Sequence, residues 1–242
     1  MIATLTALLL AHALADFVLQ TDWMATNKRD PRALLTHTAI VLASVVATTG
    51  SLRPELLALS AAHLAIDLAK ALSGRRGLAA FLLDQAAHIA TLIALCLYAP
   101  DLWTTGFWTT LPWSATPQIP ALMALATGLI LATRAGGFAI GMLMEPFAIN
   151  MPPGLKNGGR AIGLLERGLI FLLIIAGMAE AIGFLIAAKS VLRFGTISDD
   201  RAVSEYVIIG TLASFGWAIA AAFVTVFLLS LLPPLGIPDL TP

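Results

Sequence analysis

The chain has 242 residues, of which 59% are hydrophobic and 12% are charged, and its 14 Lys and Arg residues balance its 14 Asp and Glu residues. Soluble domains carry about 25% charged residues, so this composition excludes an ordinary soluble domain and predicts an integral membrane protein. The zero net charge and the lack of a basic run exclude nucleic acid as an expected partner and leave membrane lipids. A single cysteine, Cys96, excludes an internal disulfide.

The apolar stretches predict an all-α, polytopic membrane bundle with about seven membrane segments. Residues 1–100 contain four of these segments and form the first predicted domain. Residues 101–120 follow as a loop that is rich in Trp and Pro and contains no Lys or Arg. Because Trp favours the headgroup level, we expect this loop to lie at a membrane surface. The four predicted spans of the first domain cover residues 2–20, 33–49, 55–72 and 78–99.

Residues 121–242 predict a second set of membrane helices, and one of their stretches is too long for a single span. Residues 160–194 would form a helix of about 50 Å at 1.5 Å per residue. We therefore expect a broken or re-entrant helix that turns between Gly177 and Gly183. Four of its charged residues are expected to form structural ion pairs, namely Glu166, Arg167, Glu180 and Lys189.

The basic residues predict the orientation of the chain. Lys and Arg are concentrated in the connections after the first and third spans, whereas the connections after the second and fourth spans contain only Arg53. Because positive charge marks the cytoplasmic side of a membrane, the N-terminus is predicted to be extracytoplasmic.

Every histidine lies in the first domain, in a pattern shared with three aspartates. Two H-x3-D pairs lie on the first and third spans, a reversed pair lies on the fourth span, and the second span adds one histidine. The pairs and the single histidine are His12 and Asp16, His63 and Asp67, Asp84 and His88, and His37. The repeat of 51 residues between the two H-x3-D…H frames predicts that a helical hairpin has been duplicated in tandem. Residues four apart share a helix face, so each pair can point at one site.

Imidazole and carboxylate groups are the ligands of zinc and related divalent ions. Charged groups inside a bilayer usually face a bundle interior, so we expect the seven side chains to gather in two adjacent layers near the cytoplasmic ends of their spans. The predicted metal ligands are His12, Asp16, His37, His63, Asp67 and His88. Zinc is the expected metal, with manganese or iron as alternatives. Asp84 is predicted to act as a general base or as a further ligand. A single intramembrane His-Asp pair has a simpler interpretation, a hydrogen bond that fixes helix packing.

Two basic residues are candidates for substrate binding. Lys70 follows His63 by seven residues on the same helix face, where it could receive an anionic headgroup, and Arg160 could hold a lipid phosphate. The alternative for Lys70 is a lysine that extends to the membrane interface. Gln85 is a candidate partner that orients a metal ligand.

The chain resembles a bacterial inner-membrane family known as domain of unknown function 3307. The first part of the resemblance is carried by HALADFVLQTDWMATNK at 12–28, AHLAIDLAK at 62–70 and FLLDQAAH at 81–88. GRAIGLLER at 159–167, AIGFLIAAKSVLRFG at 181–195 and SEYVIIGTLASF at 204–215 resemble the C-terminal extension of many members. The resemblance implies a location in the bacterial inner membrane and supplies no reaction.

Three functions are compatible with these residues. The first is a membrane-embedded, metal-dependent hydrolase that acts on a lipid or lipid-linked substrate at the cytoplasmic leaflet. The second is a transporter of divalent cations or protons through the same site. The third is a structural membrane protein whose polar pairs only fix helix packing.

Overall fold

The computed structural model describes residues 1–112, 116–149, 155–194 and 201–235. In these ranges the chain is all-α, as predicted. Trp113 of the predicted interfacial loop lies outside the described residues. The helices are α1 (Ile2–Leu14), α2 (Asp22–Thr26), α3 (Pro31–Thr49), α4 (Glu55–Ser73), α5 (Leu78–Tyr98), α6 (Ile119–Ile130), α7 (Gly136–Met144), α8 (Gly158–Ile175), α9 (Ala181–Phe194) and α10 (Arg201–Ser230). Two five-residue π-helical turns extend α1 and join α6 to α7, and they are Ala15–Leu19 and Leu131–Ala135.

Among the described residues, six helical stretches are long and apolar enough to cross a membrane, so this is a multi-pass membrane protein. They are Ile2–Leu19, Pro31–Thr49, Glu55–Ser73, Leu78–Tyr98, Thr116–Phe147 and Arg201–Ser230. These six stretches correspond to six of the about seven predicted segments. The other predicted segment, the broken or re-entrant stretch 160–194, consists of α8, which carries three charged residues in its 18 positions, and α9, whose 14 residues span only about 21 Å.

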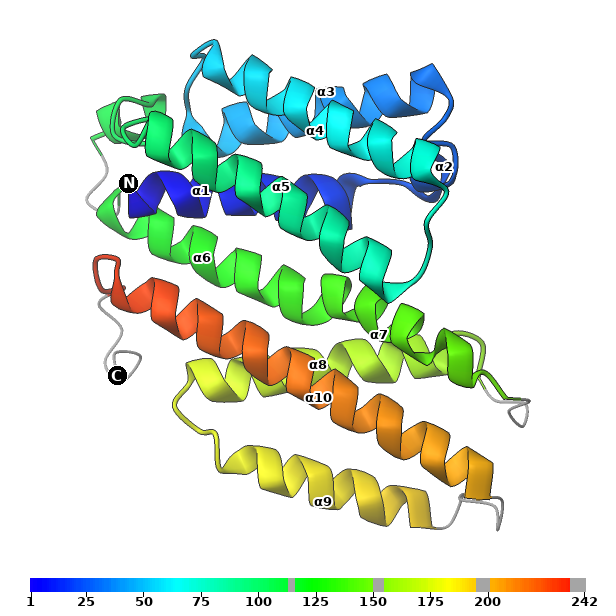
Figure 1. Cartoon of the computed structure of the whole chain (residues 1–242). Coiled ribbons are helices and arrows are strands. Elements are labelled where there is room, and N and C mark those ends of the chain that lie inside the picture. Colours follow the sequence, from blue (N-terminus) through cyan, green and yellow to red (C-terminus); the bar gives the residue numbers. More distant parts are fainter. Residues whose placement is uncertain (113–115, 150–154, 195–200, 236–242) are drawn as a thin grey trace.

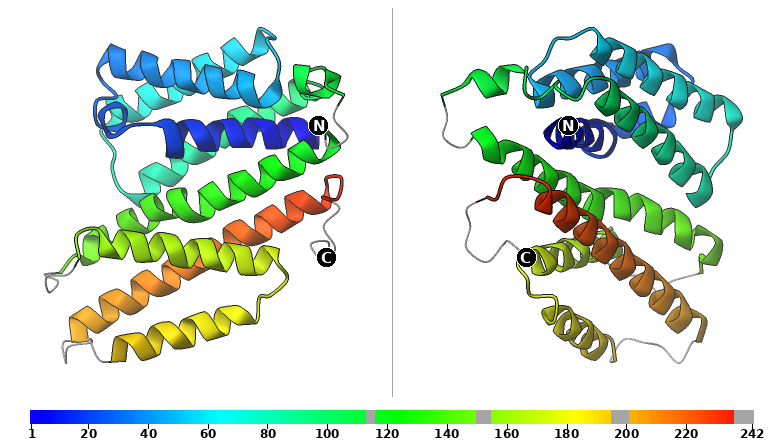
Figure 2. Two further views of the ribbon diagram at one scale, coloured as in Figure 1. Left: turned by 180° about the vertical axis from the view of Figure 1, so that it is seen from behind. Right: turned by 60° about the vertical axis from the view of Figure 1, so that its left-hand side comes forward.

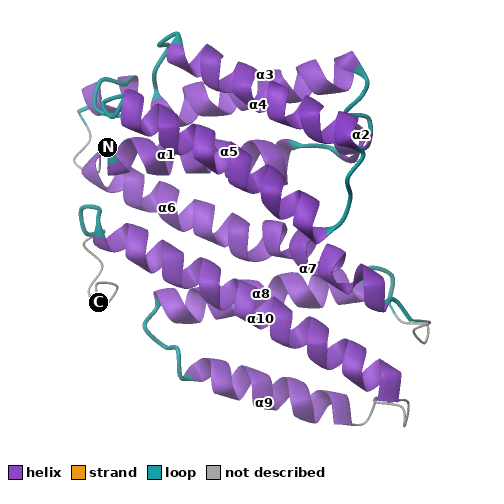
Figure 3. Cartoon of the chain, in the orientation of Figure 1, coloured by secondary structure: helices purple, strands orange, loops and turns teal. Residues whose placement is uncertain are grey.

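The helices run roughly parallel or antiparallel to one another and form successive layers (Figures 1 and 2). Figure 1 shows α3 and α4 at one side, then α1 and α5, then α6 with α7, then α8 with α10, and α9 at the opposite side. Figure 3 shows helices, turns and loops in the described chain and no strand. The centrally placed α1 packs against α3, α5 and α6. Its polar face is consequently enclosed by neighbouring helices.

The loop after α5 closes one end of the first four long helices. Gly50 ends α3 in the left-handed conformation, with φ at 64°, and its carbonyl accepts a 2.7 Å hydrogen bond from the Phe107 N–H. The Trp108 indole N–H donates to the Ala47 carbonyl at 2.7 Å. Hydrogen bonds from Arg53 to Asp101 hold the pKa of the Asp101 carboxyl below its usual range. These contacts fix the loop against the ends of α3 and α4.

The two predicted hairpin units differ in their connections. The connection between α1 and α3 contains the short helix α2, whereas the connection between α4 and α5 is the four-residue stretch Gly74–Gly77. The proposed duplication is therefore carried by the H-x3-D…H frame alone, and it stays a prediction.

The long apolar stretch after Arg160 consists of two helices. α8 ends at Ile175 and α9 begins at Ala181, with Gly177 between them at φ of 69°. Glu166 of α8 accepts a 2.7 Å hydrogen bond from Lys189 of α9. Glu166 and Lys189 are two of the four residues that were expected to form ion pairs, and their pair links α8 to α9.

Arg167 differs from its predicted role as a member of an ion pair. Its guanidinium is buried and donates to the Thr133 carbonyl from Nε at 3.3 Å and from Nη2 at 3.0 Å. Nη1 donates to the Ser214 hydroxyl at 3.1 Å. Thr133 lies in the second π-helical turn, and such turns leave carbonyls free for partners outside the helix.

Gly128 is expected to be essential for the packing of α6 in the C-terminal half. A Cβ atom at this position would lie 2.8 Å from the Phe171 ring and closer still to the Thr225 hydroxyl. We expect Gly128→Ala to destabilise the protein by about 1–3 kcal/mol, the usual cost of overpacking. The measurement is thermal unfolding in detergent. Gly141→Ala is the matched control, because a Cβ there meets no atom within 4 Å, and an equal loss in both variants would contradict the expectation.

Candidate metal centre

The seven predicted His and Asp residues converge inside the bundle formed by α1, α3, α4 and α5. α1 and its π-helical extension contribute His12 and Asp16, and α3 contributes His37. α4 contributes His63 and Asp67, and α5 contributes Asp84 and His88. All seven side chains are buried, with exposed fractions of 7% or less. Buried ionisable groups in a membrane protein are by default candidates for a functional site.

Four ligand atoms from three spans form a compact cage. The Nε2 atoms of His37 and His63 lie 3.1 Å apart. Asp16 Oδ1 lies 3.4 Å from each of these nitrogens, and Asp67 Oδ2 lies 3.5 Å from His37 Nε2 and 3.7 Å from His63 Nε2. In a tetrahedral zinc site with bonds of about 2.0–2.1 Å, neighbouring ligand atoms lie about 3.3 Å apart. The five distances, of 3.1–3.7 Å, are close to this spacing.

The hydrogen bonding of the cage also fits a bound cation. Asp16 Oδ1 and Asp67 Oδ2 are buried and have no hydrogen-bond partner among the described residues. Buried acceptors without a partner are costly, and a cation at the centre of the cage would satisfy both oxygens. The cage therefore has the ligand atoms and the spacing expected of a metal site, and two of its oxygens lack hydrogen-bond partners that a metal ion would replace.

Asp84 and His88 form a second group with Asp67. The ligand atoms of these three residues lie within 4.8 Å of one another. His88 Nδ1 lies 2.9 Å from the Asp84 carbonyl oxygen, which can only accept, so Nδ1 carries the proton and Nε2 offers its lone pair. His88 Nε2 and Asp84 Oδ1 are both buried without a described partner. Since Asp67 belongs to both groups, its carboxylate could bridge two ions.

His12 belongs to a third group, with Asp16 and His63. His12 Nε2 lies 3.1 Å from Gln85 Oε1 and donates to it, so Nδ1 offers its lone pair and lies 3.8 Å from Asp16 Oδ1. Gln85 thus orients a candidate ligand, the role expected for it. The π-helical turn begins three residues after His12 and contains Asp16. Single π-helical turns occur frequently at functional sites, where the extra residue changes the direction of a side chain.

Two lysines each donate a hydrogen bond to one carboxylate oxygen of a clustered aspartate. Lys28 Nζ lies 2.5 Å from Asp67 Oδ1, and Lys70 Nζ lies 2.7 Å from Asp84 Oδ2. In each pair the second carboxylate oxygen has no described hydrogen-bond partner. The lysines therefore position the carboxylates and offset part of their buried charge. Lys28 was not among the predicted site residues, because it lies in a connection whose basic residues indicate only orientation.

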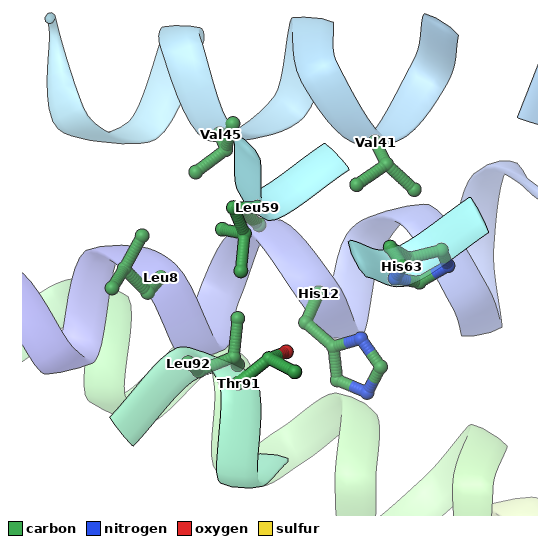
Figure 4. Close-up of a pocket in the computed structure, with 9 residues that line it drawn as sticks. Leu8, His12, Val41, Val45, Leu59, His63, Thr91 and Leu92 are labelled. Atoms are coloured by element: carbon green, nitrogen blue, oxygen red, sulfur yellow. The ribbon is translucent and has the colours of Figure 1, made fainter. Parts of the chain in front are cut away.

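The side of the cluster toward the N-terminus of α1 is closed by apolar side chains (Figure 4). A cavity of about 10 Å³, which is roughly the space of one water molecule, adjoins His12 and His63 there. It is lined by Leu8, Ala11, Val41, Val45, Leu59, Thr91 and Leu92. Beyond it, the core cluster that includes Leu56 and Cys96 fills the bundle. In the described residues, mainly apolar side chains therefore fill the space between the cluster and that end.

Arg160 is the one predicted site residue that the structure does not bring to the cluster. It is exposed near the start of α8. None of the described hydrogen bonds or ion pairs joins it to the seven residues.

Lys28→Met is expected to destabilise the metal-free protein, because Asp67 would be left buried without its cation. Breaking a buried ion pair from one side costs about 3–5 kcal/mol, and partial exposure of Lys28 lowers our expectation to about 2 kcal/mol. Thermal unfolding with and without added zinc measures this effect. Zinc should raise the Tm of the variant more than that of the wild type, and an equal rise in both would contradict the role of Lys28.

Residues 4–111 match the family model described as "Protein of unknown function (DUF3307)". This part of the chain belongs to that family, as predicted, and further C-terminal sequence extends beyond it. The match covers all seven clustered residues and both lysines. Neither the curated proteins nor the solved structures contain a match to the chain.

Proposed function

We propose that the protein is a membrane-embedded, metal-dependent hydrolase that acts on a lipid or lipid-linked substrate. The observation that carries the proposal is the cage of two imidazole nitrogens and two carboxylate oxygens, whose carboxylate oxygens lack hydrogen-bond partners. In a cage that served only helix packing, we would expect donors closer to these oxygens than the 3.4–3.7 Å at which the imidazole nitrogens lie. Zinc suits the mixed imidazole and carboxylate ligands and the tetrahedral spacing, with manganese or iron as alternatives.

The proposed location is the bacterial inner membrane, with the N-terminus extracytoplasmic and the cluster reached from the cytoplasmic leaflet. Lys28 and Lys70 support this orientation, since both lie at the end of the bundle where basic connections are concentrated. A substrate would therefore approach past these lysines and meet the aspartates before the histidines.

A bound divalent ion would polarise the substrate and lower the pKa of a bound water. His37, His63, Asp16 and Asp67 would hold it, while the hydrogen bond from Lys28 keeps Asp67 in place. Asp84 Oδ1 is the candidate general base, because it faces the cluster and is not occupied by a hydrogen bond. Gln85 and the Asp84 carbonyl fix the tautomers of His12 and His88, so that each presents a lone pair.

Transport of cations or protons is less well supported. A transporter needs ligands or water along a path to both sides. Here the described ligands gather at one depth, and apolar residues close the bundle on one side of them.

The proposal is tested by incubating the purified protein with ester, amide and phosphoester lipids in mixed micelles and measuring the released products. We expect hydrolysis that stops with a chelator and returns with added zinc or manganese. Efflux of zinc from proteoliposomes without any hydrolysis would support the transporter instead. A protein that neither hydrolyses lipids nor binds metal would support the structural alternative.

A further inference from the structure

We propose that the substrate is an anionic lipid whose hydrocarbon chain lies in a groove between α4 and α5. This inference rests on the proposed function and specifies its substrate class. It combines two observations on opposite sides of the cluster. One is an apolar groove that shares two lining residues with the cavity beside His12 and His63, and the other is a pair of lysines at the aspartates.

The groove has a volume of about 520 Å³, within the range of ligand sites in proteins. Small side chains make it hollow, with Ala58 and Ala62 one turn apart on α4 and with Thr91 and Ala94 on α5. The remaining lining residues are Glu55, Leu59, Leu95 and Tyr98. Leu57, Ile93 and Leu97 nearby are exposed large apolar side chains of the same two spans. This face therefore lies against lipid in a membrane, and hydrocarbon chains fill the groove.

The groove adjoins the interior of the site. Leu59 and Thr91 line both the groove and the small cavity beside His12 and His63. Along α4, the lining residue nearest to Lys70 is Ala62, 8 residues or about 12 Å away. The chain of a lipid whose headgroup is at the level of Lys70 can therefore reach the groove.

The charge of the cluster points to an anionic headgroup. Three aspartates and two lysines leave one net negative charge when the histidines are neutral, as metal ligation requires. One divalent ion changes this to one net positive charge, and a second ion increases it further. Because uncompensated charge inside a membrane is costly, the loaded site favours a substrate that brings negative charge.

The lysines can contact such a headgroup without releasing the aspartates. An ammonium group has three N–H donors, and the described hydrogen bond of each lysine uses one of them. The Lys70 side chain is 30% exposed, so it can be reached from outside the cluster. A phosphate or carboxylate at this position would lie beside Asp84, the candidate general base.

The position of the chain is tested by photo-crosslinking with a phosphatidic acid that carries a diazirine in its acyl chain, in phosphatidylcholine nanodiscs. We expect labelling concentrated on residues 55–62 and 91–98, identified by mass spectrometry. Ala62→Trp fills the groove and should reduce this labelling by about tenfold, the effect of losing contact with about two methylene groups. Ala61→Trp is the matched control, because Ala61 is exposed but does not line the groove.

The headgroup preference is tested with the same probe and its phosphatidylcholine counterpart. We expect the wild type to be labelled more by the anionic probe, Lys70→Met to lose this preference, and Lys70→Arg to keep it. Equal labelling by both probes in the wild type would overturn the anionic headgroup. Labelling spread evenly over the lipid-facing helices, and equal in the two Trp variants, would overturn the groove. Both outcomes are distinguishable from failure of the proposed function, because zinc content and metal-dependent lipid hydrolysis are measured on the same samples.

Discussion

His63→Ala is expected to raise the Kd for zinc at least about 100-fold, since loss of a partner that only orients a ligand already costs 10–100-fold. His63 belongs to two of the three groups that could hold an ion. Its Nε2 atom lies within 3.1–3.7 Å of the other three atoms of the cage. Removing it opens the cage, so zinc affinity and metal-dependent hydrolysis should fall together. Competition against a chromophoric chelator measures the affinity.

Ser60→Ala is the control for this variant. Ser60 is buried one turn from His63 on α4, and its hydroxyl donates only to the Leu56 carbonyl of the same helix. The control should bind zinc with the affinity of the wild type. Unchanged zinc affinity in His63→Ala would show that the bound ion lies elsewhere, and it would contradict the proposed cage.

Asp84→Asn is expected to reduce kcat by about 10²- to 10⁴-fold, the usual contribution of a positioned general base. The amide keeps the shape of the side chain but cannot accept a proton in the reaction. The four cage ligands do not include Asp84, so the variant should still retain zinc. The assay compares kcat on the best lipid from the hydrolysis screen with zinc content in the same preparation.

The substitution also leaves Lys70 without its anionic partner, which could lower stability rather than catalysis. The double variant with Asp84→Asn and Lys70→Met removes the unpaired charge, and it should recover stability without recovering kcat. Recovery of activity in the double variant would show that Asp84 serves only to balance Lys70. Full activity in Asp84→Asn would exclude it as the base.

The amino-acid sequence predicts the membrane bundle and the convergence of the seven residues well, for a simple physical reason. A spacing of four residues places His63 and Asp67 on one face of α4, and a charged pair in an apolar helix must turn inward. The same rule applies to His12 with Asp16, and to Asp84 with His88. Because the seven residues lie at similar depths in their spans, the polar faces of the four helices meet in the interior of the bundle.

Local spacing does not predict which atoms meet between helices. In the structure, Asp16 lies near His37 and His63, on two other helices, and the π-helical turn that carries Asp16 has no signature in the sequence. Lys28 reaches Asp67 from a connection, where periodicity gives no information. Arg167 finds a carbonyl of another helix instead of a carboxylate. Tertiary packing determines these partners.

The central claim is that imidazole and carboxylate groups of the cage bind a divalent metal, and X-ray absorption at the zinc K-edge tests it most directly. Zinc-loaded protein in detergent should show only nitrogen and oxygen ligands at about 2.0–2.2 Å, with scattering from imidazole rings that weakens in His63→Ala. Cys96 is remote from the cluster, in the apolar core that closes the bundle. A sulfur ligand at about 2.3 Å, or a protein that retains no zinc, would contradict the account.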